Sequence, residues 1–493
     1  MSDELDRLAH AVLVAATAGT VEPPPWLRAR LARGLGAVCL FGRNVVDTTQ
    51  VRAFTDRLRD AAADRPDGGL LVVTDEEGGD VTRLHHATGS PHLGPWALGT
   101  VDDESVTRAT GRSIGNDLAA AGVDWDFAPV ADVSATRESP VLGVRSFGSD
   151  PEAVARHARA TVDGLHDAGV LATVKHFPGH GATSADSHTD LPRVTLTRAE
   201  LDGTQLVPFA AIVRHGVDAA MVGHLLVEAL DPGLPASLSP AAIGLLRRDL
   251  GFTGTVVTDA LEMRAVVETW TLPHAAVLAL RAGADALCLS GDLHDEEVVD
   301  AAVRAVVAAV RAGELPADRL AEAAGSVARL RARRAELAGA GAGDLADAAG
   351  GVPYSAAARS LRIRGDVALA PGPVEVVVLD PAPNRAAGRL PWHPGDPLVA
   401  ARPGSALRVL GAEAPGSLPL PANGRGLLLV VRDLHRHPAA GESVAAALAA
   451  RPDAVVVEFG MPVLDPGGRG WVGTGGASAA SVRAVVRLLQ GRP

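Results

Sequence analysis

Short apolar runs alternate with amphipathic stretches through the first two thirds of the 493-residue chain. Each run has the length of a buried strand, and each amphipathic stretch has the spacing of a helix that covers a sheet. This alternation predicts an α/β fold in which eight parallel strands close into a (β/α)₈ TIM-type barrel. A doubly wound open sheet is the alternative. The apolar runs are 11–16, 37–41, 70–74, 123–130, 171–174, 219–222, 255–258 and 284–289, and the amphipathic stretches include 47–63, 150–168 and 197–215.

Polar residues follow almost every one of these runs. In a parallel barrel the functional groups gather where the strands end, at the C-terminal face. A single polar residue after a strand is commonly a helix cap, so only the repetition is informative. This repetition favours the barrel over the open sheet. The residues concerned are 42–44, 75–79, Asp132, Lys175, His176, His224, Asp259 and Asp292.

A second module follows the barrel. Residues 302–337 have the pattern of a long helix with a break at 313–316, and the small, Gly-rich segment after it is typical of a linker. We therefore predict a barrel domain over 1–338, a linker over 339–351 and a smaller C-terminal α/β sandwich domain over 352–493. The strands predicted for that domain are 374–379, 407–410, 427–431 and 455–459, with helices at 443–451 and 478–490.

The sequence Gly-Thr-Gly-Gly-Ala-Ser at 473–478 precedes the last predicted helix. Such a turn can bind phosphate at a helix N-terminus. We prefer a strand-to-helix turn in which Ser478 caps the helix. Neither module contains a Walker motif or a dinucleotide fingerprint.

Composition and charge narrow the classes of function. The chain is 47% hydrophobic and 21% charged, as soluble globular proteins are, and its net charge is −12. That charge argues against a nucleic-acid partner or an anionic membrane surface. No apolar run is long enough for membrane insertion, and residues 1–20 carry acidic residues where a signal peptide needs basic ones, so we predict a cytoplasmic protein. Cys39 and Cys288 lie in apolar runs and are predicted to be buried thiols. The oligomeric state is left open.

Lys175 stands out because it is the only lysine in the chain. Every other long basic side chain is arginine, so the sequence has kept lysine where a compact ammonium fits and a planar guanidinium does not. Lys175 and His176 directly follow the apolar run 171–174, and Pro178 and Gly179 then break regular structure. We predict that both side chains are functional.

Asp186 and His188 lie two positions apart in the polar loop that follows. In extended backbone such residues face the same way, so the carboxylate can reach the imidazole. The pairing favours the protonated ring, which can give a proton to a leaving group and later take one from water. Metal ligation by His176, His180 and His188 is not predicted, because the spacing matches no standard zinc site and Lys175 would repel a cation.

These motifs together resemble the β-N-acetylglucosaminidase, or β-hexosaminidase, branch of glycoside hydrolase family 3 in its two-domain form. The most specific are Lys-His-Phe-Pro-Gly-His-Gly at 175–181 and Asp-Ser-His at 186–188. The resemblance covers roughly 37–292, with the motifs in chain order. The others are Asp-Glu-Glu-Gly-Gly at 75–79, Phe-Ala-Pro-Val-Ala-Asp-Val at 127–133, Gly-Val-Arg-Ser-Phe-Gly at 143–148, Pro-Ala-Ser-Leu-Ser at 235–239 and Thr-Asp-Ala-Leu-Glu-Met at 258–263.

The resemblance implies a retaining hydrolase that releases terminal β-linked N-acetylglucosamine from cell-wall or chitin-type saccharides. Asp259 would be the nucleophile of a glycosyl-enzyme intermediate, and His188, held by Asp186, would be the general acid and base. It implies no metal, no organic cofactor and no partner beyond a small carbohydrate substrate. The side chains that it implies in sugar binding are Asp75, Arg145, Lys175, His176 and Met263.

Three positions depart from the family pattern. Asp80 stands where Arg is usual, Glu76 replaces a common Gln, and Ser139 replaces a common Asn. An extra carboxylate at the mouth of the site would weaken the binding of anionic, muramic-type substrates unless it is turned outward.

Three other functions stay open at this point. A β-glucosidase of the same family would take its acid from the second domain, where Glu458 is the candidate. A phosphorylase would use the same histidine, which repels phosphate less than a carboxylate does. A non-catalytic sugar-binding protein would have no need of Asp259, Asp186 and His188 together.

Overall fold

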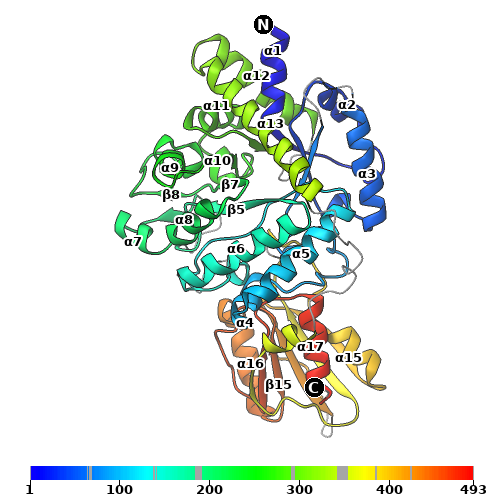
Figure 1. Cartoon of the computed structure of the whole chain (residues 1–493). Coiled ribbons are helices and arrows are strands. Elements are labelled where there is room, and N and C mark those ends of the chain that lie inside the picture. Colours follow the sequence, from blue (N-terminus) through cyan, green and yellow to red (C-terminus); the bar gives the residue numbers. More distant parts are fainter. Residues whose placement is uncertain are drawn as a thin grey trace.

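The computed structural model describes residues 2–63, 65, 69–136, 139, 142–183, 191–289, 295–340, 354–383, 386–421 and 425–491. Two sheets lie one beyond the other along the long axis of the molecule (Figure 1). The larger sheet is built by the N-terminal part of the chain and the smaller by the C-terminal part. Among the described residues, no helix combines the length and the apolar character that a membrane span requires.

The larger sheet is a parallel barrel of eight strands, as the sequence predicts. Its order is β10-β1-β2-β3-β4-β5-β7-β9, and all the pairings are parallel. A bridge between Val257 and Ala286 joins the two ends of this order. Every predicted apolar run overlaps one strand. The strands are β1 Leu13–Ala16, β2 Ala37–Leu40, β3 Leu71–Thr74, β4 Trp125–Asp126, β5 Leu171–Phe177, β7 Ala219–Val222, β9 Thr255–Thr258 and β10 Leu287–Leu289.

Helices surround the barrel and begin where the sequence offers caps. Asp47, Asp150 and Thr197 each accept a backbone N–H at the first turn of a helix. The predicted break at 313–316 separates α12 from α13. The helices of this part are α1 Ser2–Ala11, α2 Pro25–Ala32, α3 Thr48–Ala61, α4 Pro95–Val101, α5 Glu104–Ala120, α6 Pro151–Asp167, α7 Arg198–Gly203, α8 Leu206–His215, α9 Pro240–Gly244, α10 Arg264–Val267, α11 Leu272–Ala282, α12 Glu296–Arg311 and α13 Ala317–Ala340.

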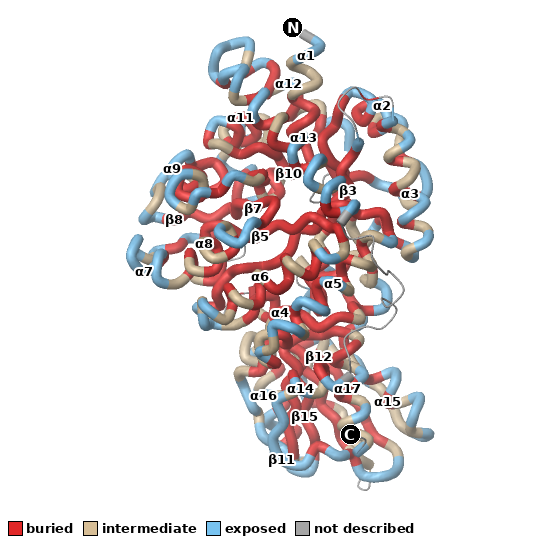
Figure 2. The backbone as a smooth tube through the Cα atoms, viewed as in Figure 1, coloured by how far each residue is buried: buried red, intermediate tan, exposed pale blue. Residues whose placement is uncertain are grey.

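The barrel has an inner and an outer apolar layer, because successive strand residues face opposite sides. In β1, Val14 belongs to the inner layer, whereas Leu13 and Ala15 pack outward under the helices. Cys39 and Cys288 are both buried in the inner layer as thiols outside any disulfide, as predicted. Figure 2 shows the strands as continuously buried tubes, while the outer turns of the helices are exposed.

The C-terminal sheet has six strands in the order β11-β16-β15-β14-β12-β13, and β11 is antiparallel to β16. Apolar clusters cover both of its faces, so helices and sheet form a sandwich. The sequence predicts four of these strands and misses β11 and β16. The elements are α14 Tyr354–Arg359, β11 Arg362–Gly365, β12 Val374–Asp380, α15 Gly395–Ala401, β13 Ala406–Gly411, β14 Gly426–Val431, α16 Pro438–Ala450, β15 Val455–Glu458, β16 Gly470–Gly473 and α17 Ala479–Leu489.

The domain boundaries themselves stay predictions. Helix α13 continues to Ala340, and residues 341–353 lie outside the described part of the chain. We use "C-terminal domain" below for the described residues from 354 to 491.

Asp80 joins the two parts of the molecule. Its buried carboxylate forms an ion pair with Arg432 and accepts the Ala477 N–H at 2.6 Å. Ala477 lies in the glycine-rich turn 473–478, and Ser478 caps α17 as predicted. The carboxylate of Asp80 therefore occupies the position near the helix N-terminus where a phosphate could have bound. Asp80 is turned toward the C-terminal domain and away from the mouth of the barrel.

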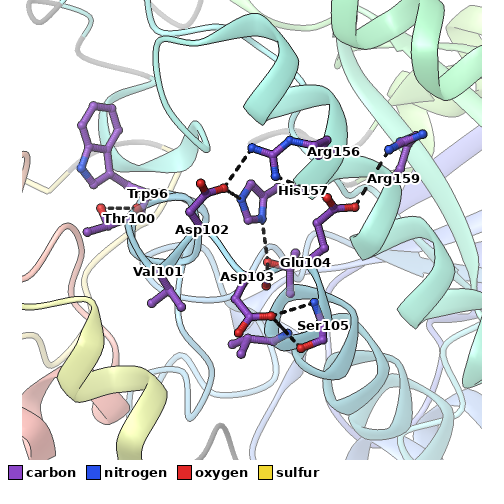
Figure 3. A network of polar contacts seen from close by, with 12 residues as sticks. Trp96, Thr100, Val101, Asp102, Asp103, Glu104, Ser105, Arg156, His157 and Arg159 are labelled. Atoms are coloured by element: carbon purple, nitrogen blue, oxygen red, sulfur yellow. Dashed lines mark hydrogen bonds and ion pairs between the residues drawn. The ribbon is translucent and has the colours of Figure 1, made fainter.

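A second contact lies at the start of α5. Figure 3 shows this corner, where Asp102 meets Arg156 and His157, and Asp103 accepts from Ser105. From α14, Arg359 donates to the carboxylate of Asp103 at 3.2 and 3.3 Å. The same carboxylate thus caps α5 and ties α14 to the barrel.

Candidate active site

A cavity of about 640 Å³ opens where the barrel strands end. Its walls come from the segments that follow β2, β3, β4 and β9 and from β5, β7 and β10 themselves. Most of the side chains that the sequence singled out meet there. The predicted residues that line the cavity are Asp75, Arg145, Lys175, His176, Asp259 and Met263. The predicted pair Asp186 and His188, and Asp292, lie outside the described residues.

Strand β5 places two consecutive side chains in the cavity. The apolar pattern predicts a strand that stops at residue 174, but β5 continues to Phe177. Neighbouring residues of a regular strand face opposite sides. Here the pairing of β5 with β7 shifts register between Val174 and Phe177, and both Lys175 and His176 reach the cavity. An irregular strand of this kind re-aims side chains beside a site.

Lys175 is the centre of a buried ion network. Its Nζ lies 2.7 Å from Asp75 Oδ1 and 2.7 Å from Glu77 Oε1. Glu77 also receives two hydrogen bonds from Arg145, at 2.8 Å from Nε and 2.7 Å from Nη2. Lys175 and Glu77 are each only 1% exposed. Two carboxylates and two cations therefore balance in charge, as buried ions require.

The network fixes which groups are charged. Burial alone would raise the pKa of Asp75, but Lys175 and Arg83 outweigh it and the pKa is lowered. Burial likewise opposes ionisation of Glu77, and Arg145 with Lys175 lowers its pKa well below the ordinary range. Burial would lower the pKa of Lys175, whereas Asp75 and Glu77 raise it. Both carboxylates are thus anions at neutral pH and poor proton donors.

Asp132 orients the His176 ring and holds the backbone of His180, the two histidines of the Lys-His-Phe-Pro-Gly-His-Gly motif. It accepts from His176 Nδ1 at 2.7 Å and from the His180 backbone N–H at 2.7 Å. With Nδ1 held by Asp132, the other nitrogen of His176 is the one free to face the cavity. Burial lowers the pKa of His180 to about 4, against the attraction of Asp132, so that ring is neutral.

Asp259 stands directly after β9 on the cavity wall. Its Oδ1 accepts the Ala260 backbone N–H at 2.8 Å, and its own N–H donates to Val222 of β7. His224 is buried and has its Nε2 2.8 Å from the Ala260 carbonyl oxygen, which supports the same turn. Met263 is buried beside this turn and begins α10.

The mouth of the cavity is cationic and receives residues from both domains. Arg83 lies 3.6 Å from Asp75 Oδ2, and both Arg43 and Arg83 stack on the ring of Phe41. The segment 386–390 of the C-terminal domain also lines the cavity. Residues 387–390 continue into a second cavity of about 710 Å³ between the domains. The C-terminal domain therefore supplies part of the wall around any bound molecule.

Glu458, the alternative proton donor, does not line either cavity. It is buried at the end of β15, where its carboxylate accepts backbone N–H groups of Asp433, Leu434 and Gly460 at 2.6 to 3.0 Å. It holds the backbone of its own domain together.

Sequence reasoning missed several residues of the cavity. Glu77 and His180 are part of the quoted motifs but received no role, and their positions inside those motifs were the available signal. Phe41, Arg83 and the segment 386–390 carried no signal, because their proximity depends on the assembled fold. Among the described residues, one cluster could hold a metal ion, formed by His85, His92 and Asp117, and it lies outside the cavity lining.

Known proteins resemble this chain over both domains. Residues 28–330 match the family model described as "Glycosyl hydrolase family 3 N terminal domain". A β-hexosaminidase of Alkalilimnicola ehrlichii is 41% identical over 270 residues, which are 54% of this chain and 75% of that protein. The β-hexosaminidase LpqI of Mycobacterium tuberculosis is 41% identical over 256 residues, 50% of this chain and 64% of LpqI.

A solved structure is similar over nearly the whole length. The glycoside hydrolase family 3 β-N-acetylglucosaminidase from Paenibacillus sp. str. FPU-7 superposes with a TM-score of 0.88 at 31% identity. The match covers 99% of this chain and 97% of that one. The similarity therefore includes the C-terminal domain.

Proposed function

Because the chain belongs to glycosyl hydrolase family 3, and is a glycosidase, we propose that it releases terminal β-linked N-acetylglucosamine with retention of configuration. The observation that carries the proposal is that Asp259, Lys175 and Asp75 line the same cavity. The named activities of the relatives support this sugar class.

In the proposal Asp259 is the nucleophile. A retaining glycosidase needs an ionised carboxylate against the anomeric carbon. The N–H of Ala260 holds one oxygen of Asp259 while the carboxylate lies on the cavity wall, and this arrangement supports a carboxylate aimed at a substrate.

His188 and Asp186 form the proposed acid and base. They lie outside the described residues, so the support comes from the carboxylates that the structure does describe at the cavity. Asp75 and Glu77 have lowered pKa values and form ion pairs with cationic side chains. Neither can therefore give a proton to the leaving group at neutral pH. A separate donor is needed, and the loop with Asp186 and His188 is the proposed source.

Sugar hydroxyls are the proposed partners of Lys175, Asp75, Arg145 and His176. An ammonium has three N–H donors, and Asp75 and Glu77 take two of those of Lys175. The third remains for a hydroxyl. Met263 is proposed to pack against the sugar.

The alternatives are weighed by the same geometry. A β-glucosidase that takes its proton from Glu458 is disfavoured, because that carboxylate lies on backbone N–H groups away from both cavities. Phosphorolysis stays an alternative outcome of the test below. A cytoplasmic location and the absence of a nucleic-acid partner stay predictions. The natural aglycone stays open.

The test is release of 4-nitrophenol from its β-N-acetylglucosaminide and its β-glucoside, with and without phosphate. We expect turnover of the N-acetyl substrate, and a loss of about 10³-fold or more in Asp259→Ala and His188→Ala. Asp202→Ala, which removes an exposed carboxylate paired with Arg198, is the matched control and should retain activity.

Two results would change the proposal. If phosphate accelerates turnover and a sugar phosphate forms, the enzyme is a phosphorylase. If a 5-fluoro N-acetylglucosaminyl fluoride, which keeps the 2-acetamido group, labels a carboxylate other than Asp259, the assigned nucleophile is wrong.

A further inference from the structure

A second cluster of functional groups lies between the loop after β3 and helix α5. His85 and His92 come from the loop, and Asp117 comes from the helix. Asp117 Oδ2 lies 3.0 Å from His85 Nε2 and 2.8 Å from His92 Nε2. The two rings stand edge to face, with centroids 6.0 Å apart. One carboxylate oxygen thus gathers both imidazoles.

We propose that His85, His92 and Asp117 bind a divalent transition-metal ion of the Zn²⁺ type, separate from the glycosidase site. Their ligand atoms all lie within 4.8 Å of one another. Zinc bonds of about 2.0–2.2 Å in a tetrahedron put ligand atoms roughly 3.3 Å apart. The observed N–O separations need to open by only a few tenths of an ångström. Two imidazoles and one carboxylate suit zinc better than calcium or magnesium, which prefer oxygen ligands.

Exposure and charge allow an ion to enter. The His92 side chain is 2% exposed, whereas those of His85 and Asp117 are 22% and 28% exposed. A water molecule can therefore supply a fourth ligand from the open side. The Asp117 carboxylate, which faces both imidazoles, supplies the negative charge that a cation needs.

The surroundings predict reversible binding. A ligating histidine usually donates its other ring N–H to a fixed acceptor, and loss of such a partner weakens metal affinity by about 10- to 100-fold. His92 Nδ1 is buried and has no hydrogen-bond partner in the described part of the structure. We infer a site that exchanges its ion with the medium.

Metal binding would act on the loop that lines the sugar cavity. Four residues of the loop line that cavity. Three of them precede His85 and one lies between His85 and His92, namely Val81, Thr82, Arg83 and His86. An ion that joins His85 and His92 to α5 would hold this loop in place. It would raise the melting temperature by mass action, because it binds the folded state alone.

The test uses the full chain after removal of metal with a chelator. Zn²⁺ is titrated by calorimetry and by thermal unfolding, into the wild type, His85→Gln and His92→Gln. Glutamine keeps a hydrogen-bond donor toward Asp117 but is a poor zinc ligand. His215→Gln is the control, because it alters a simple His–Asp pair with Asp163 on the same barrel.

We expect the wild type and His215→Gln to bind one equivalent of Zn²⁺ reversibly, with a rise in melting temperature that a chelator removes. Both cluster variants should lose that equivalent and the rise. Should a glutamine variant fail to fold, anomalous diffraction from zinc-soaked wild-type crystals decides. Density between the three side chains supports the site. If zinc is found only at His176 and His180, or if no zinc is found, the proposal is wrong. The three side chains then do no more than hold the loop to α5 by hydrogen bonds.

Discussion

Glu77 and Glu458 both lie near the carboxyl end of a parallel strand, but their pKa values are shifted in opposite directions. Each is buried at or just beyond the carboxyl end of a parallel strand, β3 or β15. Glu77 is bound by Arg145 and Lys175, and its pKa is lowered. Glu458 is bound by backbone N–H groups, and burial together with the nearby Asp433 raises its pKa to about 8.

The difference teaches that a carboxylate at a strand end has no fixed role. Cations within hydrogen-bonding distance keep Glu77 ionised at the edge of a ligand cavity. Backbone amides alone do not offset the burial of Glu458. The partners, more than the position, decide whether such a group serves a ligand or the fold.

The largest effect should come from Glu77→Gln. The change leaves Arg145 and Lys175 buried without their shared counter-ion, so we expect a loss of about 3–5 kcal/mol in the free energy of unfolding. Urea unfolding at pH 7 measures it, and activity should fall with it. A cost no larger than that of an exposed pair would contradict the role given to the network.

Glu458→Gln should act through the pH dependence of stability. The native state holds a proton on Glu458 that the unfolded chain has released between about pH 4.5 and 8. Wild-type stability therefore falls as pH rises through this range, by at most about 1.4 kcal/mol per pH unit. The glutamine variant should lose this slope. At low pH its free energy of unfolding should be about 1–3 kcal/mol lower than that of the wild type. Unfolding at pH 5, 6.5 and 8 tests it, and an unchanged slope would refute it.

Asp80 is an intermediate case, since it has one cation, Arg432, and one backbone N–H. Burial raises its pKa and Arg432 offsets only part of that. A double-mutant cycle with Asp80→Asn and Arg432→Met should give a coupling energy of about 1–2 kcal/mol. Additive single effects would show that the ion pair contributes nothing to the contact between the domains.

The smallest effect should come from Glu228→Gln. Glu228 pairs with Arg193 at 3.3 Å, but both side chains are about half exposed or more. Water screens such pairs, so the expected change is about 0–1 kcal/mol. It also serves as the control for Glu77→Gln, measured in the same urea titration.

The sequence predicts the elements of this fold well wherever burial is uniform. Barrel strands are covered on both faces, so each one leaves a continuous apolar run. The two missed strands lack that signal. All four residues of β11 are exposed, and β16 is a four-residue strand with glycine at both ends.

The sequence singles out several residues that line the cavity, but it does not predict the ion pairs among them. Lys175, Arg145 and Asp75 were identified, yet the contact of Arg145 with Glu77 joins positions 68 apart. Asp80 meets Arg432 across 352 positions. Contacts between positions so far apart in the sequence leave no periodic signal. The sequence therefore does not decide whether Asp80 adds a charge at the mouth of the site or is turned outward, and the fold places it between the domains.

The burial of Lys175 has a practical side. It carries the only ε-amine of the protein, which lies between two carboxylates and is 1% exposed. Reagents that couple to amines therefore find no reactive lysine on the folded surface. A dye, a resin or a cross-linker with this chemistry therefore has no lysine to attach to while the barrel is folded. An ε-amine that becomes reactive reports unfolding, so amine labelling followed by mass spectrometry gives a single-residue measure of how often the barrel opens.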